Sequence, residues 1–445
     1  MWRLITGGLP DNAPVNTVRE DPVRKGLLFA GTETSVWVSF DDGDHWEPLQ
    51  LNLPHTSMRD LWIHDDDLIV ATHGRSFWVL DDISPLRQIT ESAAQSEEYL
   101  FKPAIAYRVR RDTNTDTPIP PDEPTAQNPP DGAIIDYFLA QPTTAPVTLE
   151  ILDGQGKLAR KFSDADKPEP SAEELSKELI PQYWIRMPKI LSSSAGMHRW
   201  VWDLRYPSPR APRSEYPIAA VPGDTPRLPL GPMAVPGQYT VRLTVRGLMF
   251  TEPLILKMDP RVKTSQEGLA LEFQKEQVLA KMMTQNTEAL MRVRSLREQL
   301  QKLTGKASDA STATGASSSA GKISGPLADA ISAFDKKLSL ILGGAGGPGG
   351  FGAATSASPT LGRSAGAIAG LYGEIDRADA APTAAQLAAI DATEKDFSAV
   401  LKLWQEFQAT DVPALNRQLK SAGLTELRIE AALFSGSGDD EGNYE

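Results

Sequence analysis

Short runs of apolar residues separated by turn residues fill the first hundred positions of the chain. The stretches GLLFAGTETSVWVSFDDGDHW and DLIVATHGRSFWVLDDISPL superpose with an offset of 41. The matched pairs include Ala30 with Ala71, Trp37 with Trp78 and Val38 with Val79. Each copy holds β-rich runs, such as LLFAG and VWVSF, with the spacing of antiparallel hairpins. A unit of roughly 40 residues with about four strands is typical of one propeller blade, so the pattern predicts blades over residues 1–112.

Strands also dominate residues 131–262, which follow a Pro-rich connection at 113–130. The runs IIDYFLA, VTLEILD, MHRWVWDLRYP and PGQYTVRLTVRG are separated by turn signals, as in an immunoglobulin-like β-sandwich. The pairing of GMHRWVWDLR with VPGQYTVRL resembles the bacterial immunoglobulin-like module of flagellar hook assembly proteins, which implies packing or binding. The Pro- and Arg-rich insert at 207–232 is expected to form a long loop. Alternation places His198 beside Trp200 and Trp202, which favours packing over catalysis.

From Ser265 onward the apolar period becomes helical. Apolar residues recur at three- and four-residue steps at Leu279, Met283, Leu290, Val293, Leu296, Leu300 and Leu303, and again at Leu327, Ile331, Phe334, Leu338 and Ile341. Further helices are expected near 361–377, 384–408 and 412–422, with Pro382 in a first turn. The stripes favour mutual packing into a helical bundle over 265–433 rather than a coiled-coil partner surface. Linkers are expected at 304–322 and 343–360, and an acidic tail at 434–445.

Composition narrows the classes of function. The chain carries 58 Asp and Glu against 45 Lys and Arg, and its formal charge of −13 argues against nucleic acid or an anionic membrane as partner. It contains no cysteine, which excludes disulfides, thiol catalysis and cysteine-ligated metals. No stretch approaches the ~20 apolar residues of a membrane helix. Residues 1–15 lack the pattern of a signal peptide.

The stretch SFDDGDHW, at 39–46, follows the pattern SxDxGxxW. Ser39 and Asp41 are suited to hydrogen bonds with turn amides, Gly43 to a positive φ, and Trp46 to packing between blades. The pattern resembles the Asp-box, or bacterial neuraminidase repeat, of sialidases, sortilin-type receptors and xyloglucan-cleaving propellers. The resemblance implies a structural role for the four residues. The alternative is a catalytic acid at Asp41 or Asp42.

The second copy departs from the box, because Asp81 to Pro85 replaces its Gly and Trp positions. The stretch ATHGRSFWVLDDISPLRQI resembles the closing segment of exported bacterial sortilin-like and glycosyl-hydrolase-like repeat proteins. Aligning Trp2 with Trp46 also aligns Leu9-Pro10 with Leu53-Pro54, so Trp2 is interpreted as the end of an earlier Asp-box. About two blades are too few for a ring of roughly four to eight. We therefore expect that most of the propeller precedes Met1.

Two further groups carry candidate chemistry. The run HDDD at 64–67 directly precedes a strand, which favours a solvated hairpin turn over a divalent-ion site. His73 and Arg75, at the turn between two strands of the last blade, are weak candidates for contact with a ligand such as a carboxylate or sugar. The favoured alternative pairs Arg75 with Asp81 or Asp82.

The sequence supplies no catalytic group. The adjacent carboxylates at 41–42 and 81–82 point to opposite faces of a strand, whereas glycosidases need two facing carboxyl groups. No cofactor or metal site is expected. The favoured function is binding or scaffolding, with a glycan or protein ligand on the propeller of an exported parent protein. The alternative is part of a sialidase-like or xyloglucanase-like glycoside hydrolase. The oligomeric state stays open.

Overall fold

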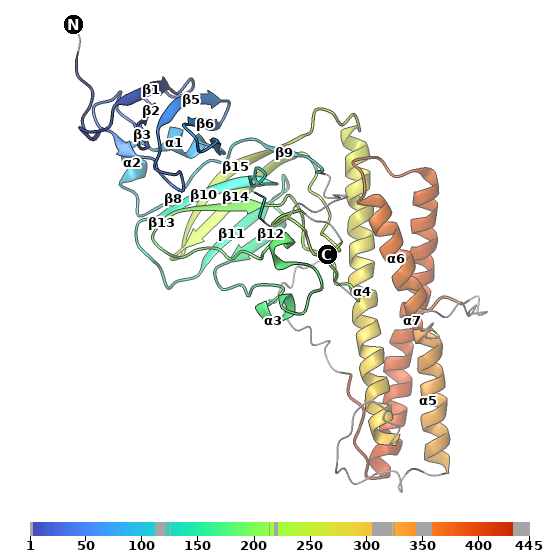
Figure 1. The fold of residues 1–445 in the computed structure, drawn as a ribbon. Helices are drawn as coiled ribbons and strands as arrows, with labels where there is room; N and C mark the ends of the chain where they lie inside the picture. Colours follow the sequence, from blue (N-terminus) through green and yellow to red (C-terminus); the bar gives the residue numbers. More distant parts are fainter. Residues whose placement is uncertain are drawn as a thin grey trace.

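The computed structural model describes residues 3–111, 122–123, 126–212, 214–217, 221–304, 323, 325–343 and 358–429. The protein is multidomain, with several β-sheets followed by a helical region (Figure 1). We call its three parts the sheet pair (residues 15–80), the central β unit (98–258) and the helical region (266–421). Trp2, the stretches 305–322 and 344–357, the tail 434–445 and most of the connection 113–130 lie outside the described residues.

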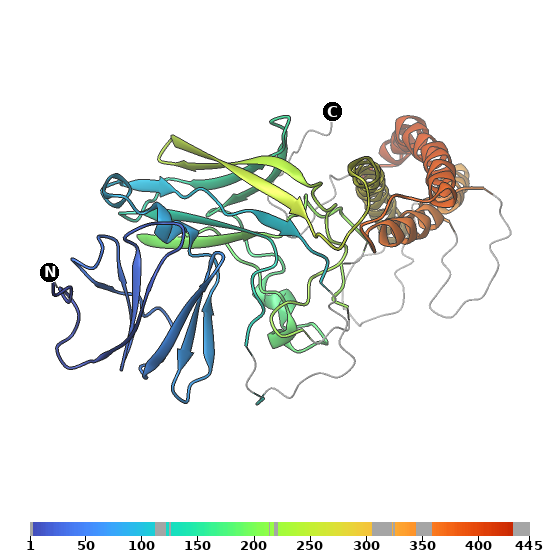
Figure 2. The ribbon, with the colours of Figure 1, turned by 90° about the horizontal axis from the view of Figure 1, so that it is seen from above.

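The sheet pair consists of two small antiparallel sheets that pack face to face, at one end of the molecule (Figure 2). The first sheet has the order β1-β2-β3-β4, and the second has the order β5-β6-β7. Their bounds are Val15–Glu20 (β1), Leu28–Thr32 (β2), Val36–Ser39 (β3), Glu47–Pro48 (β4), Met58–His64 (β5), Asp67–Thr72 (β6) and Phe77–Leu80 (β7). Phe29 and Val38 share a buried core with Leu61 and Val70 across the two sheets. Each such side chain contributes roughly 1.5–3 kcal/mol by its burial, which holds the sheets together.

Strand pairing corrects the predicted superposition of the two copies by one residue. Ala30 lies opposite Trp37 in the first sheet, but Val70 rather than Ala71 lies opposite Trp78 in the second. The reason is that the turn at 72–76 is one residue longer than the turn at 32–35. Because side chains alternate across a strand, this shift places Ala30 and Ala71 on non-equivalent faces.

The central β unit is built from two further sheets that enclose one core. The strand orders are β13-β10-β8 and β12-β11-β14-β15-β9. The bounds are Glu98–Leu100 (β8), Ala106–Arg108 (β9), Ala133–Leu139 (β10), Val147–Leu152 (β11), Leu158–Ser163 (β12), Gly196–Trp202 (β13), Gly237–Val245 (β14) and Leu248–Met258 (β15). Trp202 and Tyr137 of one sheet and Leu243 of the other are fully buried members of this core. Two short helices, α1 (Ser84–Gln88) and α2 (Glu91–Ala94), connect this unit to the sheet pair.

His198 of β13 lies on the face of the strand that also carries Trp200 and Trp202. Its ring is 5.0 Å from the ring of Tyr137, and its Nε2 is 2.7 Å from the carbonyl oxygen of Ser194.

The insert at 165–190 contains two short turns of helix, α3 (Ala172–Leu175) and the 3-10 helix Gln182–Trp184. The second insert, around 207–232, contains no named strand or helix among its described residues.

The described residues of the helical region form four helices, and Figure 1 shows the two longer ones side by side, with the two shorter ones placed one beyond the other along them. Their bounds are Gln266–Thr304 (α4), Pro326–Leu342 (α5), Leu361–Ile375 (α6) and Ala384–Ser421 (α7). They share one core, to which each helix contributes, for example Leu296, Leu338, Ile368 and Trp404. None of the helices in the described ranges combines the length and apolar character needed to cross a bilayer.

Helix α7 corrects two expectations. The predicted helices at 384–408 and 412–422 form one continuous helix with Pro413 inside it. The helix continues through Pro413 because Val412 and Leu415, on either side of it, are buried in the shared core, and this burial offsets the helix-breaking effect of proline. Pro382 is not in a first turn. It precedes the N-cap residue Thr383, whose hydroxyl accepts a hydrogen bond from the Gln386 N–H.

Replacing Pro413 by Ala should stabilise the protein by about 2 kcal/mol, because Ala restores the helical hydrogen bond that proline cannot donate. Urea unfolding followed by far-ultraviolet circular dichroism measures the change. Gln405→Ala, at an exposed site in the same helix, is the matched control and should change stability by only a few tenths of a kcal/mol. A loss of stability in Pro413→Ala would contradict the view that packing merely tolerates the proline.

Candidate functional site

The SxDxGxxW stretch forms a turn that satisfies its own polar groups. The Ser39 hydroxyl donates to Asp41 Oδ1 at 2.9 Å and accepts from the Gly43 N–H at 2.9 Å. Asp41 Oδ1 also accepts from the His45 N–H at 2.9 Å. Gly43 has a φ of +89°, in the region that favours glycine. Although partial burial opposes the change, the hydrogen bonds from His45 and Ser39 lower the pKa of Asp41. The carboxylate is therefore engaged inside the turn.

Trp46 is buried on the outer face of the first sheet, where it packs with Leu28 and Ala30. Its Nε1 donates to the carbonyl oxygen of Ile5 at 2.8 Å. Its backbone N–H donates to the carbonyl oxygen of Gly7, also at 2.8 Å. Among the described residues, the segment at 5–9 covers this outer face of the first sheet.

His73 and Arg75 lie exposed in the β6–β7 turn. The expected pairing of Arg75 with Asp81 or Asp82 is wrong, because no ion pair joins them in the described part of the chain. The backbone of Arg75 is engaged instead: its N–H donates to the Thr72 hydroxyl at 3.1 Å, and its carbonyl oxygen accepts from Trp78 Nε1 at 2.8 Å. In the part of the chain that the structure describes, His73 and Arg75 do not form a cluster with other candidate residues.

The run at 64–67 is the β5–β6 hairpin turn, and part of it is used for packing. Arg87 forms ion pairs with Asp66 in this turn and with Asp21 beside the first sheet, the latter at 3.0 Å. Asp67 accepts a hydrogen bond from the Asp82 N–H at 3.0 Å. Across the described ranges, no three His, Cys, Asp or Glu residues are placed to hold a metal ion. Arg87 thus clamps the two sheets together at their end.

The second sheet exposes an apolar face on the side away from the first. Trp62 is 61% exposed, Phe77 76% and Val79 52%. Ile69 lies between Trp62 and Val79 in register, and Ala71 lies opposite Phe77. Large apolar side chains gathered on one sheet face are typical of a contact surface rather than of scattered surface residues. The signal was present in the sequence, since every residue of FWVL is apolar and a strand points to both faces.

Arg199 of β13 joins the central β unit to the sheet pair. It forms two hydrogen bonds of 3.0 Å with the buried carboxylate of Asp136 and also donates to the carbonyl oxygens of Asp81 and Asp82. Burial raises the pKa of Asp136, and the ion pair with Arg199 opposes that rise. Asp81 and Asp82 therefore bind Arg199 through their backbone carbonyl oxygens.

A buried charge network, the helix joint, connects the central β unit to the helical region. Arg108, only 1% exposed, bonds Asp379 Oδ1 at 2.6 Å and Glu272 Oε1 at 2.9 Å. It also donates to the carbonyl oxygens of Met233 and Ala234. Its guanidinium group therefore contacts both the central β unit and the helical region. Charge-assisted hydrogen bonds of this kind are among the strongest that proteins form.

Two more arginines extend the helix joint. Arg110 pairs with Asp379 at 2.7 Å, Glu272 at 3.2 Å and Asp376 at 3.3 Å. Arg205, which follows β13, pairs with Asp376 at 2.9 Å. The acidic partners come from α4 and from the connection between α6 and α7. None of these contacts was predictable from local spacing.

One acidic group of the helix joint forms no ion pair with an arginine among the described residues. Glu276 of α4 is fully buried, and neither of its carboxyl oxygens has a hydrogen-bond partner among the described residues. Burial, followed by the nearby Asp376 and Glu272, raises the pKa of Glu276 to about 8. It is therefore mostly neutral at pH 7.

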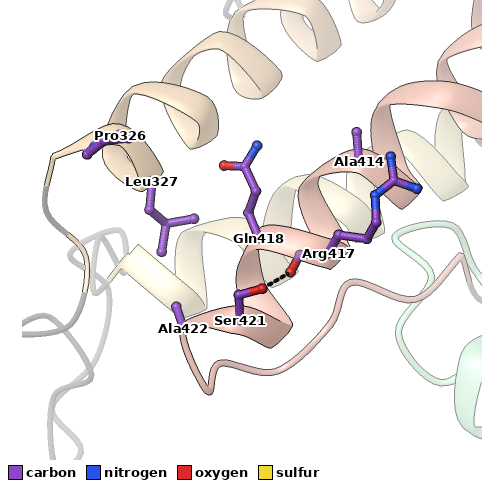
Figure 3. Close-up of a pocket in the computed structure, with 7 residues that line it drawn as sticks. All are labelled: Pro326, Leu327, Ala414, Arg417, Gln418, Ser421 and Ala422. Carbon is purple, nitrogen blue, oxygen red and sulfur yellow. Dashed lines mark hydrogen bonds between the residues drawn. The ribbon is translucent and has the colours of Figure 1, made fainter.

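A surface groove lies between the ends of α5 and α7 (Figure 3). Pro326 and Leu327 line one side, and Arg417, Gln418 and Ser421 line the other. The Ser421 hydroxyl donates to the carbonyl oxygen of Arg417 at 2.9 Å. Arg417 is the sole ionisable residue in this lining, so the groove offers no pair of acid and base groups from its described residues.

No protein-family model matches this chain, and no curated protein sequence matches it either.

Replacing Asp41 by Ala should destabilise the protein by about 1 kcal/mol, because the Ser39 hydroxyl and the His45 N–H lose their acceptor. The expected loss of stability is small because the Asp41 carboxylate is partly exposed to solvent. Asp42→Asn is the matched control, since Asn tolerates the φ of +60° at that position. Urea unfolding followed by tryptophan fluorescence distinguishes the two. Equal losses in both variants would contradict the structural role of Asp41.

Replacing Arg108 by Leu should destabilise the docking of the helical region by about 3 kcal/mol, since two buried carboxylates each lose one of their two arginine partners. Lys177→Ala, which removes an ion pair with Glu173 that is exposed on both sides, is the control and should have little effect. Thermal unfolding of the full chain measures both. Similar stability of Arg108→Leu and the wild type would contradict the importance assigned to the helix joint.

Proposed function

We propose that this chain belongs to an exported bacterial Asp-box propeller protein and binds or scaffolds a glycan or protein ligand without catalysing a reaction. In this proposal the sheet pair represents two propeller blades, the central β unit is an immunoglobulin-like sandwich, and the helical region is a bundle. The proposal that the protein is exported rests only on the resemblance of residues 71–89 to the closing segment of exported bacterial repeat proteins. The observation that carries the binding role is the exposed apolar face of the second sheet.

The kind of partner follows from comparing the two sheets by their strand pairing. The first sheet buries Phe29, Val36 and Val38 against the second sheet. In matching positions of the second sheet, the opposite-lying pair Ile69 and Val79 shares its face with Phe77. The exposed face is thus the counterpart of a face that already packs against a sheet. This favours an occupant that stacks a β-sheet on the exposed face, as a neighbouring propeller blade or a protein partner does, over a glycan.

The scaffolding role is supported by the way in which the three parts are joined. Arg199 fixes the sheet pair to the central β unit, and Arg108 fixes the central β unit to the helical region. Arginine forks hold two partners in defined directions, which suits rigid spacing between parts. A rigid body with one exposed apolar face is well suited to hold a partner at a fixed position.

Replacing both Trp62 and Phe77 by Ser should remove most of the binding capacity of the exposed face. We expect the full chain to enhance the fluorescence of anilinonaphthalene sulfonate and the double variant to lose most of that enhancement. For any extended peptide or glycan that binds the wild type in a calorimetric panel, the double variant should bind at least about tenfold more weakly, because buried aromatic side chains dominate such contacts.

Val23→Ser is the matched control, because Val23 is 70% exposed but lies outside this face. It should bind the dye and the ligands as the wild type does. Equal binding by the double variant and the wild type would contradict the proposed surface. Hydrolysis of a β-glucan or a sialoside by the chain would instead support the glycoside hydrolase alternative.

A further inference from the structure

The helix joint holds an unequal number of charged groups. Arg108, Arg110 and Arg205 contribute three guanidinium groups. The carboxyl groups number four, from Glu272, Glu276, Asp376 and Asp379. The arginines form their ion pairs with three of the four carboxyls, and within the described ranges both oxygens of Glu276 lack a hydrogen-bond partner. If Glu276 is neutral, the charges of the joint balance.

The surroundings of Glu276 come from several elements at once. Glu272 lies one turn earlier in α4, and Asp376 caps the end of α6. Arg110 follows β9 and Arg205 follows β13. The hydroxyl of Tyr372, in α6, is also near Glu276, and burial raises its pKa. Arg108 and Asp379 complete the joint beyond Glu272. Glu276 is therefore enclosed by both parts of the protein that the joint connects.

Burial without a hydrogen bond is far more costly for a carboxylate than for a carboxylic acid. The closed joint offers Glu276 no donor in the described residues, whereas an opened joint would expose it to water. We propose that the joint between the central β unit and the helical region closes around a protonated Glu276, so that the joint is tighter at mildly acidic than at mildly alkaline pH.

The direction and range of the pH dependence follow from linkage. The pKa of Glu276 is about 8 in the closed joint and has its ordinary value of 4.5 when exposed. Below about pH 4.5 both forms hold the proton, and the closed joint keeps its full stability. Between about 4.5 and 8 only the closed form holds it, so closure weakens by up to roughly tenfold per pH unit. Above about pH 8 this contribution is lost and the dependence levels off. Burial raises the pKa of Glu272 as well, which acts in the same direction.

Hydrogen exchange of the full chain tests the proposal in three proteins, namely the wild type, Glu276→Gln and Glu298→Gln. Glu298 is exposed on the same helix and serves as the matched control. After correction for the intrinsic exchange rate at each pH, protection of residues 266–280 and 370–380 should fall several-fold per pH unit between about pH 6 and 8 in the wild type and in Glu298→Gln. In Glu276→Gln this fall should be much shallower, because glutamine has no proton to lose.

An equal pH dependence in Glu276→Gln and the wild type would overturn the proposal. Glu276→Met provides a second variant, with an apolar side chain of similar length that needs no hydrogen bond. It should also show the shallower dependence. Failure of both variants to fold would overturn the proposal too, because it would mean that the joint requires a charged carboxylate at this position.

Discussion

The buried guanidinium of Arg108 is the group on which the arrangement of the central β unit and the helical region depends. A charged group removed from water is strongly destabilising unless it is fully paired, and here the partners come from two parts of the protein. The parallel pairing of β9 with β15 places Arg108 at the edge of the central β unit. Helix α4 then has to present Glu272 at that edge. The ion pairs therefore fix both the position and the rotation of α4.

A similar arrangement recurs at the other joints. Arg199 ties the buried Asp136 to the backbone at 81–82, and Arg87 ties Asp21 to the turn at 64–67. Each part of the protein has its own main apolar core in the described residues, and the sheet pair has a smaller second one around Trp46. The cores stabilise the parts individually, whereas the arginines determine how the parts are oriented. This division leaves the outer face of the second sheet free for a partner.

The sequence predicts features whose partners are close along the chain and fails where partners are distant. The hydrogen bonds of Ser39 and Asp41 lie within four residues, so the motif spacing describes them well. The extra residue in the β6–β7 turn shifts the strand alignment by one, and residue matching alone does not detect such a shift. Arg108 lies 271 positions from Asp379. No local pattern connects two residues at that separation, so the helix joint and the neutral Glu276 required the structure.

We propose that the arginine joints hold the three parts of the protein as one rigid scaffold. The chain has no cysteine, so pairs of spin labels can be attached to introduced cysteines without first removing native ones. Labels at the exposed positions Lys25 and Gln155 report on the first joint, and labels at Gln155 and Ser398 report on the helix joint. Electron-resonance distance measurements should give one narrow distance for each pair at pH 6. Broad or multiple distances in either pair would contradict the account.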